Sequence, residues 1–318
     1  MPLYLSEDDV SELLDMDIAL AAMEQLFREW GNDRAENTVR QRVRAPGVML
    51  QTLSGACEYL GRVGLKTYTT TKSVNRFLVL LFDAEGRLDA LIEADLLGRL
   101  RTGAVSGLAT ASLARPDAES VGLFGAGRQA RTQLKAVCTV RKIRRVEVYS
   151  RDEARLATFC DEMSEYCRTE VLPCRWPGQI VSGKDIVITA TTSRTPLFDG
   201  HLLDEGTHLN VVGSNHAAAA EIDVTTIARS DARVCDDLAA CRLEAGDFYP
   251  AVEAGMLEWS QLRELKDVLA GRETGRATAS DITLFKSVGL AIEDVALAAK
   301  TIDLARAAGL GRSVDIGI

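Results

Sequence analysis

The 318-residue sequence lacks the features of several protein classes. No apolar run approaches the length of about 20 residues that a membrane-spanning helix requires. Lysine and arginine are outnumbered by aspartate and glutamate, 37 to 46, and the net charge is −9. An acidic chain is poorly suited to a general surface for nucleic acid or anionic lipid. We therefore expect neither a nucleic-acid partner nor a membrane partner.

Patterns for metal binding and disulfides are also missing. The seven cysteines include no C-x-x-C pair, and the three histidines, His201, His208 and His216, are not spaced as i, i+4 pairs. An odd number of cysteines without a recognisable secretion signal is typical of reduced thiols. We therefore expect a cytoplasmic protein without a metal site.

Two different periodicities divide the chain. Before residue 94 apolar residues alternate with period two in several segments, which predicts a mainly antiparallel sheet. From Ser120 onward, apolar runs alternate with helical segments, which predicts a parallel sheet covered by helices on both faces. The strands expected there are Val121–Phe124, Val146–Tyr149, Asp185–Thr189, His208–Val212 and Ala232–Cys235.

Helical patterns give the domain boundaries. A helix rich in small residues is expected over residues 94–114, and Arg115-Pro116-Asp117 ends it. A second helical pattern covers residues 284–308, and we expect it to return to the first domain. The sequence thus predicts an α/β protein in which residues 117–284 form a domain with the alternating strands and helices of a Rossmann fold. A discontinuous α+β domain is expected at residues 1–116 and 285–318.

A glycine-rich turn follows the predicted strand Val121–Phe124. Gly125-x-Gly127-x-x-Ala130 fits the G-x-G-x-x-G/A fingerprint of dinucleotide binding. The small residues let the backbone approach a pyrophosphate, which the next helix faces with its N-terminus. A tight turn without a ligand is the alternative, but the strand–turn–helix context favours a dinucleotide. The turn residues expected to bind it are Gly125, Ala126, Gly127, Arg128 and Gln129.

The end of the second predicted strand indicates which dinucleotide binds. Ser150 and Arg151 are suited to the 2′-phosphate of NADP, whereas an acidic residue would bind the ribose hydroxyl of NAD. Asp152 is better placed to cap the next helix. We therefore predict NADP(H), with NAD(H) as the alternative. Thr189 and Thr191, at the end of another strand, are expected to line the cofactor channel, the alternative being an ordinary Ser/Thr turn.

Four motifs follow one another along the chain: Gly64-Leu65-Lys66, Leu100-Arg101-Thr102-Gly103-Ala104, Gly125-Ala126-Gly127-Arg128-Gln129-Ala130 and Thr283-Leu284-Phe285-Lys286-Ser287-Val288-Gly289. Together they resemble those of the ornithine cyclodeaminase/μ-crystallin family, and the resemblance extends over essentially the whole chain. It implies a substrate-binding and dimerisation role for the discontinuous domain, and a homodimer. It also implies hydride exchange between a nicotinamide and the α-carbon of an amino or imino acid, and cofactor contacts from Val212, Ser214 and Ser287.

Three basic residues match the family's substrate pocket: Arg42, Lys66 and Arg101. Two arginines can hold a carboxylate with paired N–H groups, and Lys66 can bind an oxygen or, if burial lowers its pKa, transfer a proton. Lys66 and Arg101 lie among apolar or small residues, where an unpaired charge is unfavourable without an anion. Arg42 lies between Arg40 and Arg44 in the sequence, so exposure to solvent is the alternative for it.

Asn215 stands where the family's cyclodeaminases and archaeal alanine dehydrogenases have an acid/base aspartate. An amide can bind an imine but cannot exchange a proton at neutral pH. His216 beside it can titrate, or can simply face solvent. We therefore predict an NADP(H)-dependent reductase of an imino acid or ketimine, or an amino-acid dehydrogenase in reverse, with Lys66, Asn215 and His216 as catalytic residues. The alternatives are an ornithine cyclodeaminase-type ammonia lyase that retains NAD, and a non-catalytic small-molecule binding protein of the μ-crystallin type.

Overall fold

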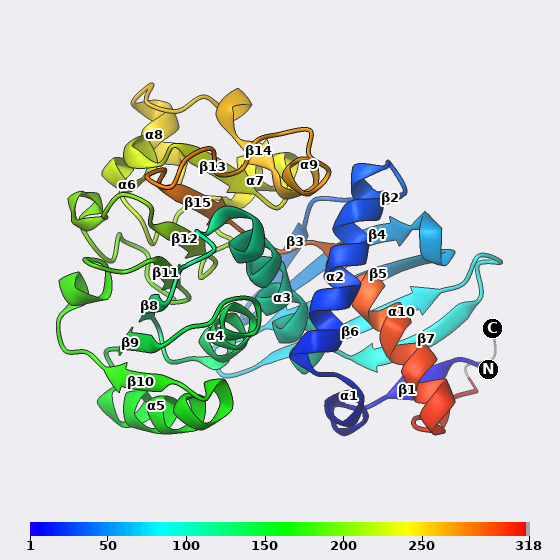
Figure 1. The fold of residues 1–318 in the computed structure, drawn as a ribbon. Coiled ribbons are helices and arrows are strands. Elements are labelled where there is room, and N and C mark those ends of the chain that lie inside the picture. The colour runs from blue at the N-terminus through cyan, green and yellow to red at the C-terminus, as the bar shows by residue number, and fades with distance from the viewer. Residues whose placement is uncertain (316–318) are drawn as a thin grey trace. The chain divides into compact units, whose positions relative to one another are not determined.

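A computed structural model gives the fold and describes residues 1–315. The chain forms two compact units, one of residues 1–101 together with residues from 290 onward, the other of residues 102–289 (Figure 1). The first junction falls within helix α3 (Asp95–Leu113), and the second lies between strand β15 (Thr283–Lys286) and helix α10 (Ala291–Ala308). Each unit has its own sheet.

The sheet of the first unit is mainly antiparallel, as the period-two pattern predicts. Its strands lie in the order β16-β1-β7-β6-β5-β4-β2, with β3 paired to β4, and β1 runs parallel to β7. Helix α10 covers one face by packing on β4, β5 and β6, and α2 packs on α10. The remaining elements of this unit are β1 (Leu3–Leu5), α1 (Glu7–Leu13), α2 (Met16–Gly31), β2 (Ala35–Asn37), β3 (Gln41–Ala45), β4 (Val48–Cys57), η1 (Glu58–Leu60), β5 (Arg62–Thr70), β6 (Asn75–Phe82), β7 (Leu88–Glu93) and β16 (Arg312–Ser313).

Two glycines bring α10 close to this sheet. Gly55 on β4 and Gly64 on β5 are directly paired in the antiparallel ladder. A Cβ atom at Gly55 would come within 2.6 Å of Ile292 Cγ2, and one at Gly64 within 3.1 Å of Val295 Cγ2. Because neither position carries a side chain, the first turns of α10 lie directly on the strands. The acidic residues of those turns can therefore reach side chains of the sheet.

The sheet of the second unit is parallel, in the order β10-β9-β8-β11-β12-β15-β13-β14. The first five strands have the Rossmann order 3-2-1-4-5, in which ligands bind where the order reverses, here between β8 and β11. The predicted fold class is confirmed. The elements are β8 (Ser120–Phe124), α4 (Arg128–Val140), β9 (Arg145–Tyr149), α5 (Glu153–Cys167), β10 (Glu170–Pro173), η2 (Pro177–Ile180), β11 (Ile186–Thr189), η3 (Gly200–Leu202), β12 (His208–Val211), α6 (Val224–Arg229), β13 (Ala232–Cys235), α7 (Leu238–Glu244), α8 (Tyr249–Glu253), η4 (Trp259–Gln261), β14 (Arg263–Glu264) and α9 (Leu265–Leu269).

The prediction of one helix over residues 284–308 is wrong in its first part. Thr283–Lys286 is the strand β15, and α10 begins only at Ala291. All four residues of β15 are buried, and the strand is paired on both sides, with β12 and with β13. A buried segment of only four residues has no periodicity that distinguishes a strand from a helix, and here the pairing with the neighbouring strands decides.

The compact units divide after residues 101 and 289, whereas the sequence places the boundaries after residues 116 and 284. The second half of α3 packs within the parallel unit, which accounts for the earlier division. A Cβ atom at Gly103 would lie 2.5 Å from the carbonyl oxygen of Thr132 on α4. Asn210 on β12 donates a hydrogen bond of 2.9 Å to Thr110.

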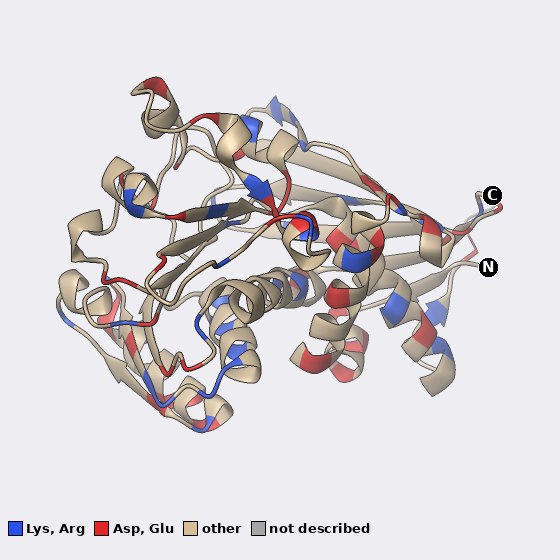
Figure 2. Ribbon diagram, turned by 45° about the horizontal axis from the view of Figure 1, so that its top comes forward, with Lys and Arg blue, Asp and Glu red and all other residues tan. Residues whose placement is uncertain are grey.

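Charged residues are distributed over both units. Figure 2 shows lysine and arginine interspersed with aspartate and glutamate, and in that view no helix is basic along its whole length. Over residues 1–315, no helix combines the length and the apolar character needed to cross a membrane.

Candidate functional site

The glycine turn after β8 is shaped for a close approach of backbone and ligand. Gly125 has a φ of +109°, and a Cβ atom there would lie 2.5 Å from the carbonyl oxygen of Ala190. Gly127 caps α4 without a side-chain hydrogen bond, and a Cβ atom there would meet nothing within 4 Å. The N-terminus of a 13-residue helix thus faces open space. This arrangement fits a dinucleotide pyrophosphate, which the helix amides and dipole stabilise. Within the turn Ala126 is buried, Arg128 is exposed and Gln129 is half-buried.

The end of β9 lies beside this turn. The Gly125 amide donates a 2.9 Å hydrogen bond to the carbonyl oxygen of Tyr149, the last residue of β9. Asp152 caps α5 by accepting from the Arg155 amide at 3.0 Å, as predicted. Ser150 is half-buried and Arg151 is exposed. The one acidic side chain at this strand end is thus engaged with its own helix.

Two predicted cofactor ligands on the β11 loop are held by a carboxylate that the sequence did not single out. Glu221 is fully buried and accepts hydrogen bonds of 2.7 Å from the hydroxyl of Thr189, the hydroxyl and amide of Thr191, and the amide of Gly213. Both threonine hydroxyls therefore orient the loop around Glu221. Burial raises the pKa of Glu221, although the nearby Lys286 ammonium lowers it.

A buried ion pair extends this network to a third loop. Lys286 Nζ lies 2.7 Å from Asp247 Oδ2 and donates to the carbonyl oxygen of Ser214 at 2.7 Å. Asp247 also accepts from the backbone amide of Glu221 at 2.6 Å. The loops that follow β11, β12 and β15 at the carboxyl edge of the sheet are thus joined through buried charges.

The turn after β15 is organised around a third buried carboxylate, that of Asp236. Asp236 Oδ2 accepts from the Ser287 hydroxyl at 2.9 Å, the Val288 amide at 2.7 Å and the Gly289 amide at 2.8 Å. The hydroxyl predicted to bind cofactor is therefore directed to Asp236. Val212 is half-buried and donates from its amide to the carbonyl oxygen of Thr189 at 3.0 Å.

The structure brings Asn215 and His216 into one small pocket after β12. The pocket has a volume of about 220 Å³ and includes Thr192, Ser193, Arg194, Gly213, Ser214 and Ala219 in its lining. His216 is exposed, and its Nδ1 accepts a 3.1 Å hydrogen bond from the Ala218 amide, which requires that nitrogen to be unprotonated. Asn215 is half-buried.

In the first unit, Lys66 and Arg101 meet around two carboxylates of the chain itself. Lys66 Nζ lies 2.7 Å from Asp294 Oδ1, and Arg101 Nε lies 3.3 Å from the same oxygen. Arg101 Nη1 also pairs with Glu293 Oε2. The lysine and arginine are 4% and 7% exposed, and both carboxylates are fully buried. Such a cluster is stable in a protein interior only because every charge has an opposite partner.

The environment of Lys66 gives it an unusual acidity. Burial lowers its pKa, Asp294 raises it, and the positive charges of Arg101 and Arg40 lower it again, to about 8. Arg40 is buried and lies close enough to act on Lys66. Arg42 is half-buried and donates from Nε to Gln51 Oε1 at 3.2 Å. The structure therefore adds Arg40 to the predicted basic cluster.

Some of the residues that complete these sites could have been recognised from the sequence, and others could not. Glu293 and Asp294 are adjacent acids in the otherwise apolar segment of residues 291–299, and a charge in a buried helix needs a partner. Glu221 and Asp247 belong to no motif. Arg40 could not be separated from its neighbours, because which of them face the core depends on strand register. Over residues 1–315, no group of three or more histidine, cysteine, aspartate or glutamate side chains is arranged to hold a metal ion.

The parallel sheet and its glycine turn define a Rossmann-type dinucleotide-binding unit, in a chain that also forms a unit with a mainly antiparallel sheet. The sequence matches the Ornithine cyclodeaminase/mu-crystallin family over residues 2–308. The chain belongs to this family, and the resemblance seen in its motifs is confirmed.

Characterised relatives and solved structures agree with this assignment. A Delta(1)-pyrroline-2-carboxylate reductase of Bacillus cereus is 30% identical, over 98% of this chain and 99% of its own. The Thermococcus litoralis Delta(1)-pyrroline-2-carboxylate reductase in complex with NADH and L-proline has a TM-score of 0.94 and 33% identity, covering 98% of this chain and 100% of that chain. An archaeal alanine dehydrogenase dimer with bound NAD has a TM-score of 0.92 and 28% identity, covering 99% of both chains. The protein is accordingly an NAD(P)-dependent oxidoreductase.

Proposed function

We propose that the protein is an NADP(H)-dependent reductase of an imino acid or ketimine, or an amino-acid dehydrogenase when the reaction runs in reverse. The observation that supports this most directly is the buried cluster of Lys66, Arg101, Asp294 and Glu293. Its lysine has a pKa of about 8, so the side chain is mainly an ammonium at neutral pH and can still release a proton. Reduction of a C=N bond needs one hydride at carbon and one proton at nitrogen.

In this proposal Arg42, Lys66 and Arg101 hold the substrate carboxylate, with Arg40 as a further positive charge near Lys66. Guanidinium groups do this with paired N–H donors, and they keep their charge at neutral pH. Lys66 then delivers the proton to the nitrogen of the imine. Asn215 donates a hydrogen bond from its amide to the substrate and exchanges no proton. A bound nicotinamide supplies the hydride. Asn215 in place of an acid disfavours cyclodeamination, which needs an acid/base group during ammonia loss.

We propose NADP(H) as the preferred cofactor on the basis of Arg151. The side chain is exposed at the end of β9 and has no hydrogen-bond or ion-pair partner within the described residues. Asp152, the acid that would favour NAD, is occupied as the cap of α5. The solved relatives named above hold NADH or NAD, so NAD(H) is the alternative.

A substrate panel tests the activity and the cofactor together. We expect oxidation of NADPH with Delta(1)-pyrroline-2-carboxylate or with 2-oxo acids plus methylamine, and none with the same imines lacking the carboxylate. With NADH in place of NADPH, kcat/KM should fall by about tenfold or more, the scale of one charge-assisted contact. A preference for NADH would overturn the role given to Arg151. Ammonia release from ornithine without net change in NADPH would identify a lyase, and binding of an imino acid without turnover a binding protein.

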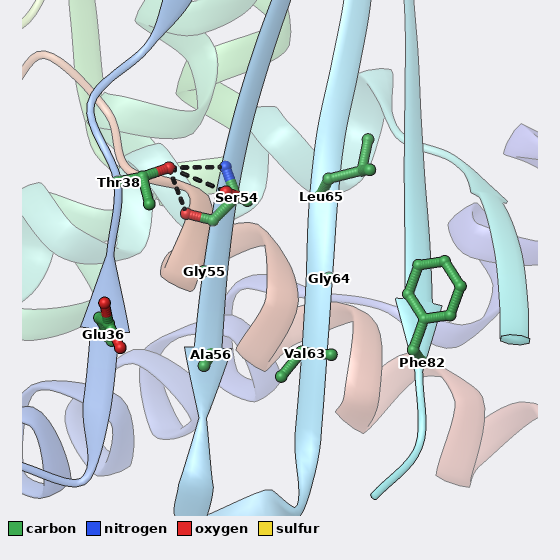
Figure 3. A pocket seen from close by; sticks show the side chains of 9 residues that line it. All are labelled: Glu36, Thr38, Ser54, Gly55, Ala56, Val63, Gly64, Leu65 and Phe82. Atoms are coloured by element: carbon green, nitrogen blue, oxygen red, sulfur yellow. Dashed lines mark hydrogen bonds between the residues drawn. The ribbon is translucent and has the colours of Figure 1, made fainter. Parts of the chain in front are cut away.

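The uncovered face of the first unit's sheet supports a homodimer. Ala56, Val63 and Phe82 lie side by side on β4, β5 and β6, opposite the face covered by α10, and Leu65 joins them in one shallow pocket (Figure 3). Val63 is 49% exposed. An apolar sheet face of this kind is usually buried in an interface. We propose that a second copy of this chain covers it, as the dimeric state of the archaeal alanine dehydrogenase suggests.

Val63→Arg is expected to convert the dimer to a monomer, because the guanidinium would be buried without a partner at the centre of the interface. The residue is exposed in the single chain, so the fold should persist. Sedimentation velocity measures the change. Met256→Arg, at a position 57% exposed in the other unit, is the control and should stay dimeric. A wild-type protein that sediments as a monomer, or a Val63→Arg protein that remains a dimer, would contradict the assignment.

A further inference from the structure

Asp294 has no role in the proposed reaction, yet it is in direct contact with the proposed proton donor, Lys66. It lies in the first turn of α10 and is fully buried. Its Oδ1 is shared by Lys66 at 2.7 Å and Arg101 at 3.3 Å, whereas its Oδ2 is buried without a hydrogen-bond partner among residues 1–315. The contacts of the Asp294 carboxylate with these two residues are thus made by one oxygen, which lies between the lysine ammonium and the arginine guanidinium.

The ammonium of Lys66 is confined on its other sides. A Cβ atom at Gly98 on α3 would come within 2.5 Å of Lys66 Nζ, so only glycine leaves room for the ammonium there. The Phe77 ring on β6 lies 5.3 Å from Nζ in a cation–π contact. Gly98, Phe77 and Asp294 together confine the position of the Lys66 ammonium group.

The charges around Lys66 have opposite effects on that proton. Arg101 on α3 and Arg40, which precedes β3, are both positive and both favour the neutral amine, as does burial. Asp294 on α10 is the group that favours the ammonium. Glu293 pairs with Arg101.

We propose that Asp294 is a positioning residue that keeps Lys66 protonated and aimed before the substrate binds. Without it, burial and two guanidinium groups would leave Lys66 as a neutral amine, which cannot donate a proton to an imine. The proposal rests on the proposed function, because it takes Lys66 as the proton donor. The ammonium is the active form, so activity should fall as the pH rises through the pKa of Lys66.

The test compares variants that separate charge from shape. Asp294→Asn keeps the shape and removes the charge, and we expect the alkaline limb of kcat/KM to move to lower pH by about one to three pH units. Asp294→Glu keeps the charge and should retain the wild-type limb, with a loss in kcat from misplacement. Glu293→Gln should raise KM through Arg101 and leave the limb in place. An unchanged limb in Asp294→Asn would overturn the proposal, as would an equal displacement in Glu293→Gln.

A titration without substrate distinguishes this proposal from the proposed function. The protein is labelled with 13Cε-lysine, and the Lys66 signal is assigned by its loss in Lys66→Arg. Its midpoint should fall in Asp294→Asn and rise in Arg40→Gln, which removes a neighbouring positive charge. If these midpoints move but no imine is reduced, the proposed function fails and Asp294 keeps its role. If Asp294→Asn does not fold, Asp294→Ser is the second variant that removes the charge, and its midpoint should fall in the same way. A Lys66 titration midpoint that stays at the wild-type value when the Asp294 charge is removed would overturn the role of Asp294.

Discussion

Replacing Lys66 by methionine is expected to lower kcat for imine reduction by about 10²- to 10⁴-fold, the usual contribution of a general acid. Methionine keeps much of the volume and the apolar stem, so the loss is that of the proton donor. The affinity for NADPH should stay within about twofold, since a group that donates a proton in the reaction contributes little to cofactor affinity. Single-turnover oxidation of NADPH and a fluorescence titration of cofactor measure the two quantities separately.

Lys300→Met is the matched control for Lys66→Met. Lys300 is an exposed lysine on α10 in the same unit, and its replacement should leave both kcat and cofactor affinity unchanged. Near-normal kcat in Lys66→Met would refute the role of Lys66. A large loss of cofactor affinity in that variant would instead indicate that the lysine shapes the nucleotide site. In Lys66→Met, Asp294 keeps Arg101 as its partner, so a moderate loss of stability is also expected.

Replacing Glu221 by alanine is expected to lower both the stability of the second unit and its affinity for NADPH. Four donors from Thr189, Thr191 and Gly213 lose their acceptor in a fully buried place. Leaving buried donors unpaired costs about 1–3 kcal/mol for each group before relaxation. We expect the free energy of unfolding to fall by about 3 kcal/mol or more. The affinity for NADPH should fall at least tenfold, because the loops after β11 and β12 lose their common anchor.

Urea unfolding and cofactor titration check this expectation. Glu221→Gln keeps one oxygen acceptor and should lose less stability than Glu221→Ala. Glu205→Ala, at an exposed position, is the control and should change neither quantity. If Glu221→Ala retained full stability and normal NADPH affinity, the carboxylate would not be what organises these loops.

Features of the fold that depend on neighbouring residues were predictable. The strand, the glycine turn and the helix after Ser120 follow each other within a few residues, and each is specified by local conformation. The role of Asp152 as a helix cap was predictable for the same reason. Lys66 and Arg101 could be recognised because a charge among small and apolar residues needs a partner. The partner itself could not be named.

Contacts between residues distant in sequence could not be predicted from local patterns. Lys66 and Asp294 are 228 positions apart, and Thr189 and Glu221 are 32 positions apart. The approach of Asp294 to Lys66 depends on how α10 packs on the sheet at Gly55 and Gly64. The strand β15 was missed because a buried run of four residues gains its identity from the two strands beside it.

The sequence by itself determined the family, the α/β class, the glycine turn and the need of Lys66 and Arg101 for charged partners, because these depend on local motifs and on the unfavourable energy of unpaired charge. Tertiary structure alone decided that Asp294 and Glu293 are those partners. It also decided that Arg40 lies close enough to act on Lys66, and that Thr189 and Thr191 bind Glu221. Those outcomes depend on strand register and on helix packing. Both are properties of the whole chain, since a side chain's partner is set by which distant backbone is brought beside it.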